Sequence, residues 1–490
     1  MINVFPNPLK YVEQKGQFSF QDRVVLTIGK SFSNQEFLRL CPELWNQFTA
    51  GKSNLEIVIT DLDNCASLST AGVSLDAPLL QDYEYTLRIS EEGAAVRNRD
   101  DNGFIHGFCT LLQLLSPYHR KANNFTVECC EVFDSPALEF RGVHFCVFPE
   151  FSLLFLKKMI RLCGLMKVSH VILEFFGMYR FGCFPYLGWP IAYTREELEP
   201  LIADGKAFGI EFIPMFNHIG HATQSRFKAG KSVVLDQAPE YEEYFEPGGW
   251  TWNVRNPEVF ELQKMAREEL CDLFGSGKYF HIGCDETYVW DNRADPMDKD
   301  DNENFVSYVN RVADSIKQMG RTPIMWGDMF LDNVEFPHTE YHSNTSSRSG
   351  DCERNFAKID KDIFIADWEY SLKEHSDKSI RYFTQRRDPK SVIMCPWQGF
   401  DKISTAARMA KEYGILGMLT TTWNGIPMEI KDLIYGICLM WEPDAEYANK
   451  VSWETLKVFA AQNLRKLVPS HGEYMDAGFT ENEVNIYLIK

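Results

Sequence analysis

Short apolar runs that alternate with amphipathic stretches constrain the fold of this 490-residue chain more than any other feature. From about residue 138 onward, helical candidates lie between most of these runs, for example at 153–167, 195–209 and 303–320. Such alternation is typical of βα units around a parallel sheet. Eight units in one block predict a (β/α)8 TIM barrel of about 300 residues, because eight repeats exceed the usual strand count of the competing doubly wound sheet. The eight runs cover 139–147, 170–176, 211–217, 279–286, 322–329, 362–370, 391–400 and 417–425.

The chain outside these repeats has a different character. Residues 1–135 are expected to form a small α+β domain, residues 136–430 the catalytic barrel, and residues 431–490 a mostly helical segment that closes or caps the barrel. Residues 338–355 are polar and have no helical period, so a loop is expected there, which either shapes the barrel mouth or is a solvated surface excursion. In the first domain, strands are predicted at 55–61, 83–90 and 94–98, and a helix at 103–115.

Composition and charge narrow the partners of the chain. Its 50 Lys and Arg against 69 Asp and Glu leave a net charge of −19, which disfavours nucleic acid and anionic membranes. No window approaches 18 consecutive apolar residues, so no membrane-spanning helix is expected. The thirteen cysteines are scattered and the first residues lack the pattern of a signal peptide, so we expect free thiols and a cytoplasmic location. The 11 tryptophans favour stacking surfaces for flat apolar faces such as sugar rings.

Polar and aromatic residues cluster at the carboxyl ends of the apolar runs. Barrel enzymes place their chemistry at this end of the strands. One such residue is readily explained by packing, but a joint pattern over several strands is not. The pattern predicts a barrel mouth lined with tryptophan around two carboxylates. The residues concerned are Glu174, Asn217, His218, His221, Asp285, Glu286, Trp326, Asp328, Asp367, Trp368, Tyr370, Trp397, Gln398, Trp423 and Asn424.

The adjacent acids Asp285 and Glu286 are the strongest catalytic candidates. They follow an apolar run, where an ionised side chain is costly to bury unless it is satisfied. Neighbours in a regular strand point to opposite faces, so both acids reach one substrate only if the chain leaves the pleat at this point. Two carboxyls in different environments can divide into a proton donor and an ionised partner. This division of labour is the chemistry of glycoside cleavage.

Two other classes of function stay open at this point. His218 and His221 form an HxxH pair, and His281, Cys284 and Asp285 follow, which would suit a metal-dependent barrel hydrolase. The first run does not begin with the HxH that such enzymes usually carry, so no metal is the favoured expectation. The third class is a catalytically silent barrel that only binds carbohydrate.

The motifs resemble those of glycoside hydrolase family 20, the β-N-acetylhexosaminidases. The segment HIGCDE (281–286) resembles that family's H-x-G-G/A-D-E signature, with Cys284 in the small-residue place. Residues 170–221 are similar in layout to the hexosaminidase D-like branch, and LLQLL (111–115) resembles a local mark of the domain that precedes the barrel. The tryptophan-bearing strand ends MWGDM (325–329), DWEY (367–370) and TTWNG (421–425) also fall where that branch has them.

The resemblance implies an exo-acting, retaining hydrolase that removes terminal β-linked GlcNAc or GalNAc, with the 2-acetamido oxygen of the substrate as nucleophile. It implies that Glu286 is the general acid and base and that Asp285 orients the acetamido group. No cofactor is required. The implied partner is an oligosaccharide or glycoconjugate that contains N-acetylhexosamine, and a homodimer is one assembly that the sequence leaves open.

The resemblance also implies a set of substrate-binding residues. Arg141 matches the strand-one arginine that grips the 3- and 4-hydroxyls, and Tyr370 is carried over as the tyrosine that holds the acetamido group. Asn424 stands where the family often has an acid, so the preference between GlcNAc and GalNAc is open. The full expected set is Arg141, Glu174, His221, His281, Trp326, Asp328, Trp368, Tyr370, Trp423 and Asn424.

Overall fold

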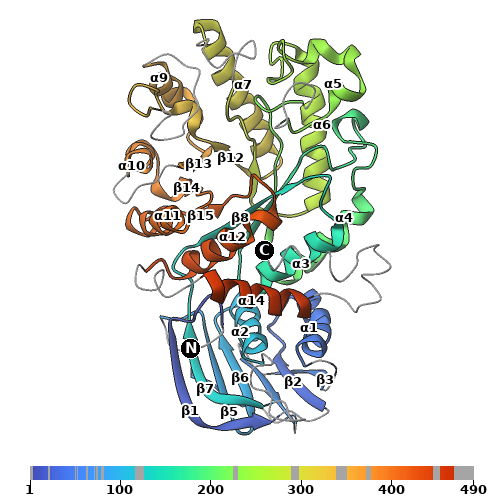
Figure 1. Ribbon diagram of the computed structural model, residues 1–490, viewed down its shortest axis with the longest axis vertical. Helices are drawn as coiled ribbons and strands as arrows, with labels where there is room; N and C mark the ends of the chain where they lie inside the picture. The colour runs from blue at the N-terminus through green and yellow to red at the C-terminus, as the bar shows by residue number, and fades with distance from the viewer. Residues whose placement is uncertain are drawn as a thin grey trace.

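The structure is a computed structural model with two parts, a barrel and a smaller domain below it (Figure 1). In the described part of the chain, eight parallel strands follow the order β10-β9-β8-β15-β14-β13-β12-β11. A further parallel pairing, between Met215 and His281, joins the two ends of this order and closes the ring. The described residues are 4–19, 23–49, 51, 53–61, 65–70, 72, 75–78, 82–115, 126–223, 230–287, 297–337, 350–370, 377–444 and 453–467.

Each of the eight predicted runs contains one barrel strand, which confirms the predicted TIM barrel. The first strand, β8, is buried at every position, as expected for a strand covered on both faces. It pairs in parallel with β9, so that Cys146 lies beside Glu174. The strands are β8 (Phe140–Val147), β9 (His170–Phe175), β10 (Glu211–Pro214), β11 (Tyr279–His281), β12 (Thr322–Trp326), β13 (Phe364–Asp367), β14 (Val392–Met394) and β15 (Gly417–Thr420).

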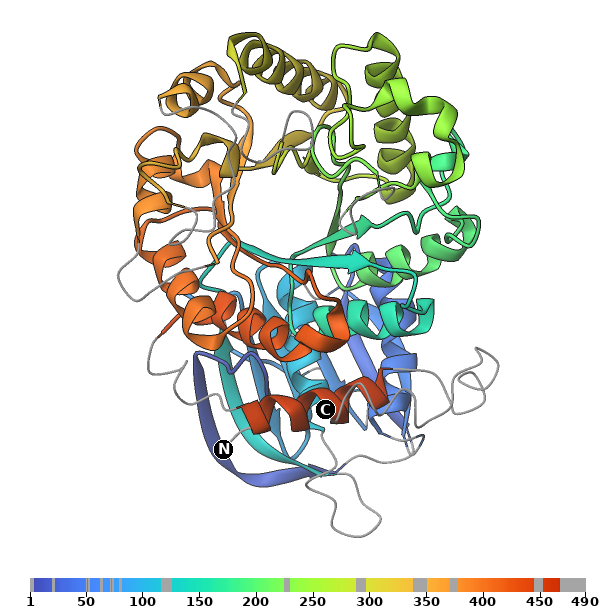
Figure 2. The same ribbon diagram turned by 45° about the horizontal axis from the view of Figure 1, so that its top comes forward.

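Helices surround the strands, as the view towards the ring in Figure 2 shows. Side chains fix several helix starts: Ser152 accepts from the backbone of Phe155, and Thr194 forms a reciprocal capping box with Glu197. The helix α9 begins within the stretch 338–355 for which no helix was expected, and residues 338–349 lie outside the described part. The helices are α3 (Leu153–Leu165), α4 (Arg195–Ala207), α6 (Pro257–Phe274), α7 (Lys299–Gln318), α9 (Asp351–Lys358), α10 (Lys378–Thr384), α11 (Phe400–Glu412) and α12 (Ile426–Trp441).

The smaller domain is one mixed sheet with two helices. Its strand order is β1-β7-β5-β6-β4-β2-β3. Helix α1 contacts α4 and helix α2 contacts α3, so the two helices lie between the sheet and the barrel. The elements are β1 (Lys10–Ser19), β2 (Arg23–Gly29), α1 (Gln35–Phe48), β3 (Asn54–Thr60), β4 (Cys65–Ser69), β5 (Tyr85–Ser90), β6 (Gly93–Asn98), α2 (Asp101–Leu114) and β7 (Thr126–Asp134).

A buried ion pair joins the two parts at the amino-terminal end of the barrel. The ammonium of Lys167 lies 2.8 Å from Asp134 Oδ2 and 2.8 Å from the hydroxyl of Tyr85, and neither member of the ion pair is exposed. The indole of Trp441 donates to the other oxygen of Asp134 at 2.7 Å. The barrel and the domain therefore share a fully buried polar contact.

The carboxyl-terminal helices also link the two parts. Helix α14 (Trp453–Lys466) contacts α12 and α3 of the barrel and α1 of the domain. The predicted domain boundary at residue 430 falls inside α12, which follows the last barrel strand and extends to Trp441. Residues 468–490 lie outside the described part. Among the described residues, no helix combines the length and the hydropathy needed to cross a membrane.

Candidate active site

A cavity of about 350 Å³ opens at the carboxyl ends of the barrel strands. Its size lies within the usual range for small-molecule sites. Segments that follow or end each of the eight strands contribute to its wall. The lining residues are Phe148, Phe176, His221, Lys231, Asp285, Glu286, Trp326, Trp368, Tyr370, Trp397 and Trp423. Seven of the twelve predicted site residues are in this lining.

The acid pair stands where the chain leaves the pleat, as the sequence analysis required. Strand β11 ends at His281, and Gly283, Cys284 and Glu286 then take φ values of 67°, 70° and 44°. A Cβ at Gly220 would lie 2.1 Å from the carbonyl oxygen of Asp285, so only glycine allows this close approach of the neighbouring segment. Left-handed non-glycine residues are costly and are concentrated at functional sites. The turn brings both carboxylates to the same cavity.

His221 connects the two carboxylates. Its Nε2 atom lies 3.2 Å from Asp285 Oδ2 and 3.5 Å from Glu286 Oε2. Burial alone would lower the pKa of His221, but Asp285 and, more weakly, Glu286 raise it above its ordinary value. Trp250 packs on the imidazole with 4.3 Å between ring centroids and donates from its indole to the carbonyl oxygen of Glu286 at 2.7 Å. The imidazole is thus oriented to carry a positive charge between the acids.

A third carboxyl lies directly behind the pair. Asp328 accepts from the backbone N–H of Glu286 at 2.9 Å and from the indole of Trp368 at 3.1 Å. Burial, and then the neighbouring charge of Asp285, raises the pKa of Asp328 well above its ordinary value. Asp328 therefore positions the general-acid candidate and one aromatic wall at the same time.

Aromatic rings form the wall and the floor of the cavity. The indole of Trp423 donates to the hydroxyl of Tyr370 at 2.6 Å, and Tyr370 packs against Trp368 at 5.0 Å and Trp397 at 5.2 Å between centroids. Trp326 is fully buried and lies 5.8 Å from Trp423. These contacts hold the rings as one rigid surface, suited to an apolar group and the flat face of a sugar.

An ion pair completes the wall on the side of β8 and β9. Lys231 Nζ lies 3.1 Å from Glu174 Oε2, and His144 Nε2 lies 3.0 Å from the same oxygen. Although burial alone would raise it, Lys231 and His144 lower the pKa of Glu174 to about 2. The ammonium also faces the rings of Phe176 at 3.7 Å and Trp423 at 4.9 Å. Lys231 is thus held at the cavity surface with hydrogen-bond donors available to a ligand.

Possible metal ligands come together differently from the expected histidines. Among the described residues, one group, His144, Cys146 and Glu174, has ligand atoms within 4.8 Å of one another. Burial raises the pKa of the Cys146 thiol well above its ordinary value, although a thiolate is the form that binds metal. The ammonium of Lys231 already neutralises Glu174. The group fits an ion pair with a neutral thiol better than a metal centre.

The structure does not place Arg141 in the site. As the second residue of β8 it lies at the amino-terminal end of the strand, whereas the cavity is at the other end. Its guanidinium donates to the carbonyl oxygens of Lys167, Leu138 and Glu139 and packs over the ring of Trp441. The expected role of Arg141 in gripping sugar hydroxyls is therefore corrected to a role in the barrel floor.

Four other expected residues lie near the cavity but not in its lining. Glu174 and Asp328 are behind it, as described. His281 is fully buried 4.3 Å from Trp326, and burial lowers its pKa to about 3, so it supports that ring as a neutral imidazole. Asn424 is exposed and donates from its backbone to Glu429 Oε2 at 3.2 Å.

Sequence reasoning missed four residues in or beside the cavity and one positioning residue. Lys231 and Trp250 lie in the irregular segment between β10 and α6, where no periodicity singles out a residue. Phe148 and Phe176 directly follow β8 and β9, so the strand-end argument that found Glu174 could have found them. Glu429 is a buried acid on α12 that accepts from Trp397, Gln398 and Asn424.

Comparison with protein families gives two matches that together cover most of the chain. The model of the glycosyl hydrolase family 20 catalytic domain matches residues 186–432, and that of domain 2 of the same family matches residues 1–135. Beta-hexosaminidase subunit A1 of Dictyostelium discoideum is 23% identical over 76% of this chain, which spans 66% of that relative's length. The beta-hexosaminidase of Akkermansia muciniphila is 25% identical over 82% of this chain and 85% of its own length.

Solved structures share the fold. The beta-N-acetylhexosaminidase from Bacteroides fragilis superposes with a TM-score of 0.63 at 18% identity, covering 89% of this chain and 90% of the other. The Streptomyces plicatus N-acetyl-beta-hexosaminidase in complex with Thio-NAglucal gives a TM-score of 0.65 at 15% identity, covering 98% and 96%. At such identities the likeness concerns the fold.

Proposed function

The chain belongs to glycoside hydrolase family 20, and we propose that it is an exo-acting, retaining β-N-acetylhexosaminidase that releases terminal β-linked GlcNAc or GalNAc. The observation that carries this proposal is the adjacent pair Asp285 and Glu286, bridged by His221 in a cavity walled by tryptophan. Relatives in the family from Vibrio harveyi and Streptomyces plicatus were solved with GlcNAc bound, which supports the sugar class.

Glu286 is the proposed general acid and base. A carboxyl in this role protonates the leaving oxygen and then removes a proton from the incoming water. Its backbone is fixed by the hydrogen bond to Asp328, and its carboxylate lies 3.5 Å from the imidazole of His221. The imidazole supplies a nearby positive charge when Glu286 is ionised, which suits a group that changes its proton state within one turnover.

Asp285 is proposed to act on the acetamido group of the substrate. Its negative charge would orient the acetamido N–H and stabilise the positive charge of the oxazolinium-type intermediate, as a preorganised electrostatic partner. An enzyme-borne nucleophile fits less well, because a retaining pair of carboxyls flanks the scissile bond about 5 Å apart. Adjacent residues that share the same histidine approach the substrate from one side.

Lys231, which is held by Glu174 behind it, is proposed to bind a sugar hydroxyl in place of Arg141. Their pair is supplied by β9 and by the segment after β10, whereas the acid pair follows β11. This separation suits the hydroxyl end of a sugar whose anomeric carbon faces Glu286. The ammonium of Lys231 offers hydrogen-bond donors, and a hydroxyl oxygen accepts hydrogen bonds.

The wider setting is also proposed. Ten of the twelve described cysteines are buried, and none of the twelve forms a disulfide, which supports a reducing compartment and the expected cytoplasmic location. The substrate would be a free oligosaccharide or a glycoconjugate with an N-acetylhexosamine at its non-reducing end. A homodimer stays a prediction, which light scattering on the purified protein would check.

A panel of aryl β-glycosides tests the proposed function. GlcNAc and GalNAc aryl glycosides should be cleaved with retention, whereas the glucose and galactose analogues, which lack the acetamido nucleophile, should be cleaved very poorly. A thiazoline mimic of the cyclised intermediate should inhibit competitively. Efficient cleavage of plain glucosides, or a covalent sugar on Asp285 in mass spectra, would reject substrate assistance.

A further inference from the structure

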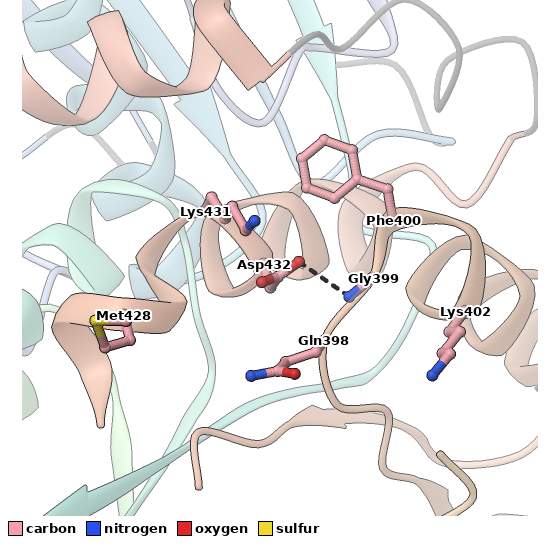
Figure 3. Close-up of a pocket in the computed structure, with 7 residues that line it drawn as sticks. All are labelled: Gln398, Gly399, Phe400, Lys402, Met428, Lys431 and Asp432. Carbon is pink, nitrogen blue, oxygen red and sulfur yellow. Dashed lines mark hydrogen bonds between the residues drawn. The ribbon is translucent and has the colours of Figure 1, made fainter. Parts of the chain in front are cut away.

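A second pocket lies beside the catalytic cavity at the carboxyl-terminal end of the barrel. It has a volume of about 590 Å³ and we call it the side pocket (Figure 3). Two segments form it, the connection from β14 into the first turn of α11, and the first turns of α12. Its lining residues are Gln398, Gly399, Phe400, Lys402, Met428, Lys431 and Asp432.

The side pocket and the catalytic cavity share a wall. Trp397 lines the catalytic cavity, and the next residue, Gln398, lines the side pocket. Both side chains donate to the same oxygen of Glu429, with the amide of Gln398 at 2.8 Å. Glu429 is only 1% exposed and belongs to α12. One buried carboxylate thus fixes the wall between the two spaces.

The backbone of this wall is held in an unusual conformation. Gln398 and Gly399 have φ values of 47° and 88°, so two successive residues are left-handed. The N–H of Gly399 donates to Asp432 Oδ1 at 3.1 Å, as the dashed line in Figure 3 marks. A left-handed glutamine is costly and persists only where its surroundings determine it. Hydrogen bonds to Glu429 and Asp432 hold this conformation. The turn directs Trp397 to the catalytic cavity and Gln398 to the side pocket.

The chemistry of the side pocket suits a sugar. Met428 is 75% exposed and, with the ring of Phe400, offers apolar surface for the C–H face of a pyranose. The amide of Gln398 and the ammonium of Lys402 offer polar groups for hydroxyls. The charges of Lys402 and Lys431 are opposed by Asp432 in the lining and by Glu429 behind it. The pocket therefore lacks the net charge that an anionic ligand requires.

We propose that the side pocket binds a sugar of the leaving chain, beyond the bond that is cleaved. The inference rests on the proposed function, because an exo-acting enzyme buries the terminal sugar and leaves the rest of the glycan at the mouth of its cavity. The side pocket is on the same face of the barrel, separated from the catalytic cavity by Trp397. The preferred substrate is then an oligosaccharide, and recognition of the leaving chain is built into α11 and α12.

Chain-length dependence of the Met428→Ala/Lys402→Ala double variant tests this proposal. The substrates are an aryl GlcNAc glycoside and GlcNAc-capped disaccharides and trisaccharides of several linkages. For the oligosaccharide that the unaltered enzyme cleaves best, kcat/KM should fall about tenfold, the size of effect that a lost apolar contact gives. Cleavage of the aryl glycoside, which has no leaving sugar, should stay within about twofold. The matched control is Lys411→Ala, at the carboxyl-terminal end of α11, the helix that carries Lys402.

The outcomes separate the two proposals. If the unaltered protein does not cleave the aryl glycoside, the proposed function fails. If it does, but the double variant treats oligosaccharides and aryl glycoside alike, the side pocket does not bind the leaving chain. Loss of aryl activity together with an altered circular dichroism spectrum would mean that the double variant misfolds. The single variants Met428→Ala and Lys402→Gln would then test the proposal through the ratio of kcat/KM for the oligosaccharide to kcat/KM for the aryl glycoside.

Discussion

The ammonium of Lys231 lies 3.1 Å from the Oε2 oxygen of Glu174, in the wall of the catalytic cavity where an arginine was expected. The pair is almost fully buried, with side-chain exposures of 9% and 3%. An isolated ammonium would be costly there, but the carboxylate neutralises it and His144 holds the carboxylate. We therefore expect the sugar hydroxyls to be bound by a lysine from the segment between β10 and α6 and not by the strand-one arginine.

Replacement of Lys231 by methionine should weaken the enzyme through substrate recognition. A hydrogen bond to a charged group contributes about 1.5–3 kcal/mol, so kcat/KM should fall about 10- to 100-fold on an aryl GlcNAc glycoside. On the 3-deoxy or the 4-deoxy analogue, whichever lacks the contacted hydroxyl, the variant and the parent should differ little. Equal losses on all three substrates would indicate a purely structural role. Lys390→Met, a half-exposed lysine at another position, is the control.

Replacement of Glu286 by glutamine should remove proton transfer. General acid catalysis contributes about 10²–10⁴ in rate, so turnover of oligosaccharides and of other poor leaving groups should fall by that factor. Activated aryl leaving groups need no proton, so their first step should be much less affected. The comparison of a nitrophenyl with an alkyl glycoside measures this difference. Equal losses on both leaving groups would contradict the assignment.

Replacement of Asp285 by asparagine keeps the shape of the side chain and removes its charge. The loss of one preorganised electrostatic partner typically costs about 10²–10³ in turnover. Because Asp285 also raises the pKa of His221, the variant should protonate that histidine at lower pH, and its NMR titration midpoint should shift down. An unchanged histidine titration would mean that the contact between the two side chains does not form in solution.

Asp367 should make the stability of the protein depend on pH. It is the buried last residue of β13, and burial raises its pKa to about 7. The folded state thus favours the protonated carboxyl. This stabilisation is complete below about pH 4, the pKa of the carboxyl in the unfolded chain, and it is lost as pH rises to about 7, its pKa in the folded chain. Asp367→Asn should remove this loss, which is about 4 kcal/mol at most. Between pH 4 and pH 8, the free energy of unfolding should fall less for the variant than for the parent. The exposed Asp362→Asn is the control.

The fold was predictable because the barrel strands are covered on both faces. That environment selects continuous apolar runs, and each of the eight runs contains a strand. The acid pair was predictable for a related reason, since ionisable residues directly after a buried run are costly unless they serve the site. The left-handed backbone at Cys284 and Glu286 is the physical form of the expected departure from the pleat.

Other parts of the site were not accessible to the same reasoning. Lys231 lies in a segment without periodicity, so its approach to Glu174 depends on tertiary packing alone. Glu429 resembles any helical acid until Trp397 and Gln398 are seen to donate to it. The error over Arg141 had a different cause. Its local motif matched the family, but as the second residue of β8 it lies at the end of the barrel opposite the cavity. Site residues follow the barrel strands, and Arg141 stands at the start of the predicted run 139–147.

The buried contact between Lys167 and Asp134 has a consequence for cooperativity. Separation of the barrel from the smaller domain would leave an uncompensated charge in each, and breaking a buried pair in this way costs about 3–5 kcal/mol. The two parts differ in topology, yet unfolding of either one would leave Lys167 or Asp134 in the other without its partner. A calorimetric scan of the intact chain should therefore record a single endotherm, because the two parts on either side of the predicted boundary unfold together.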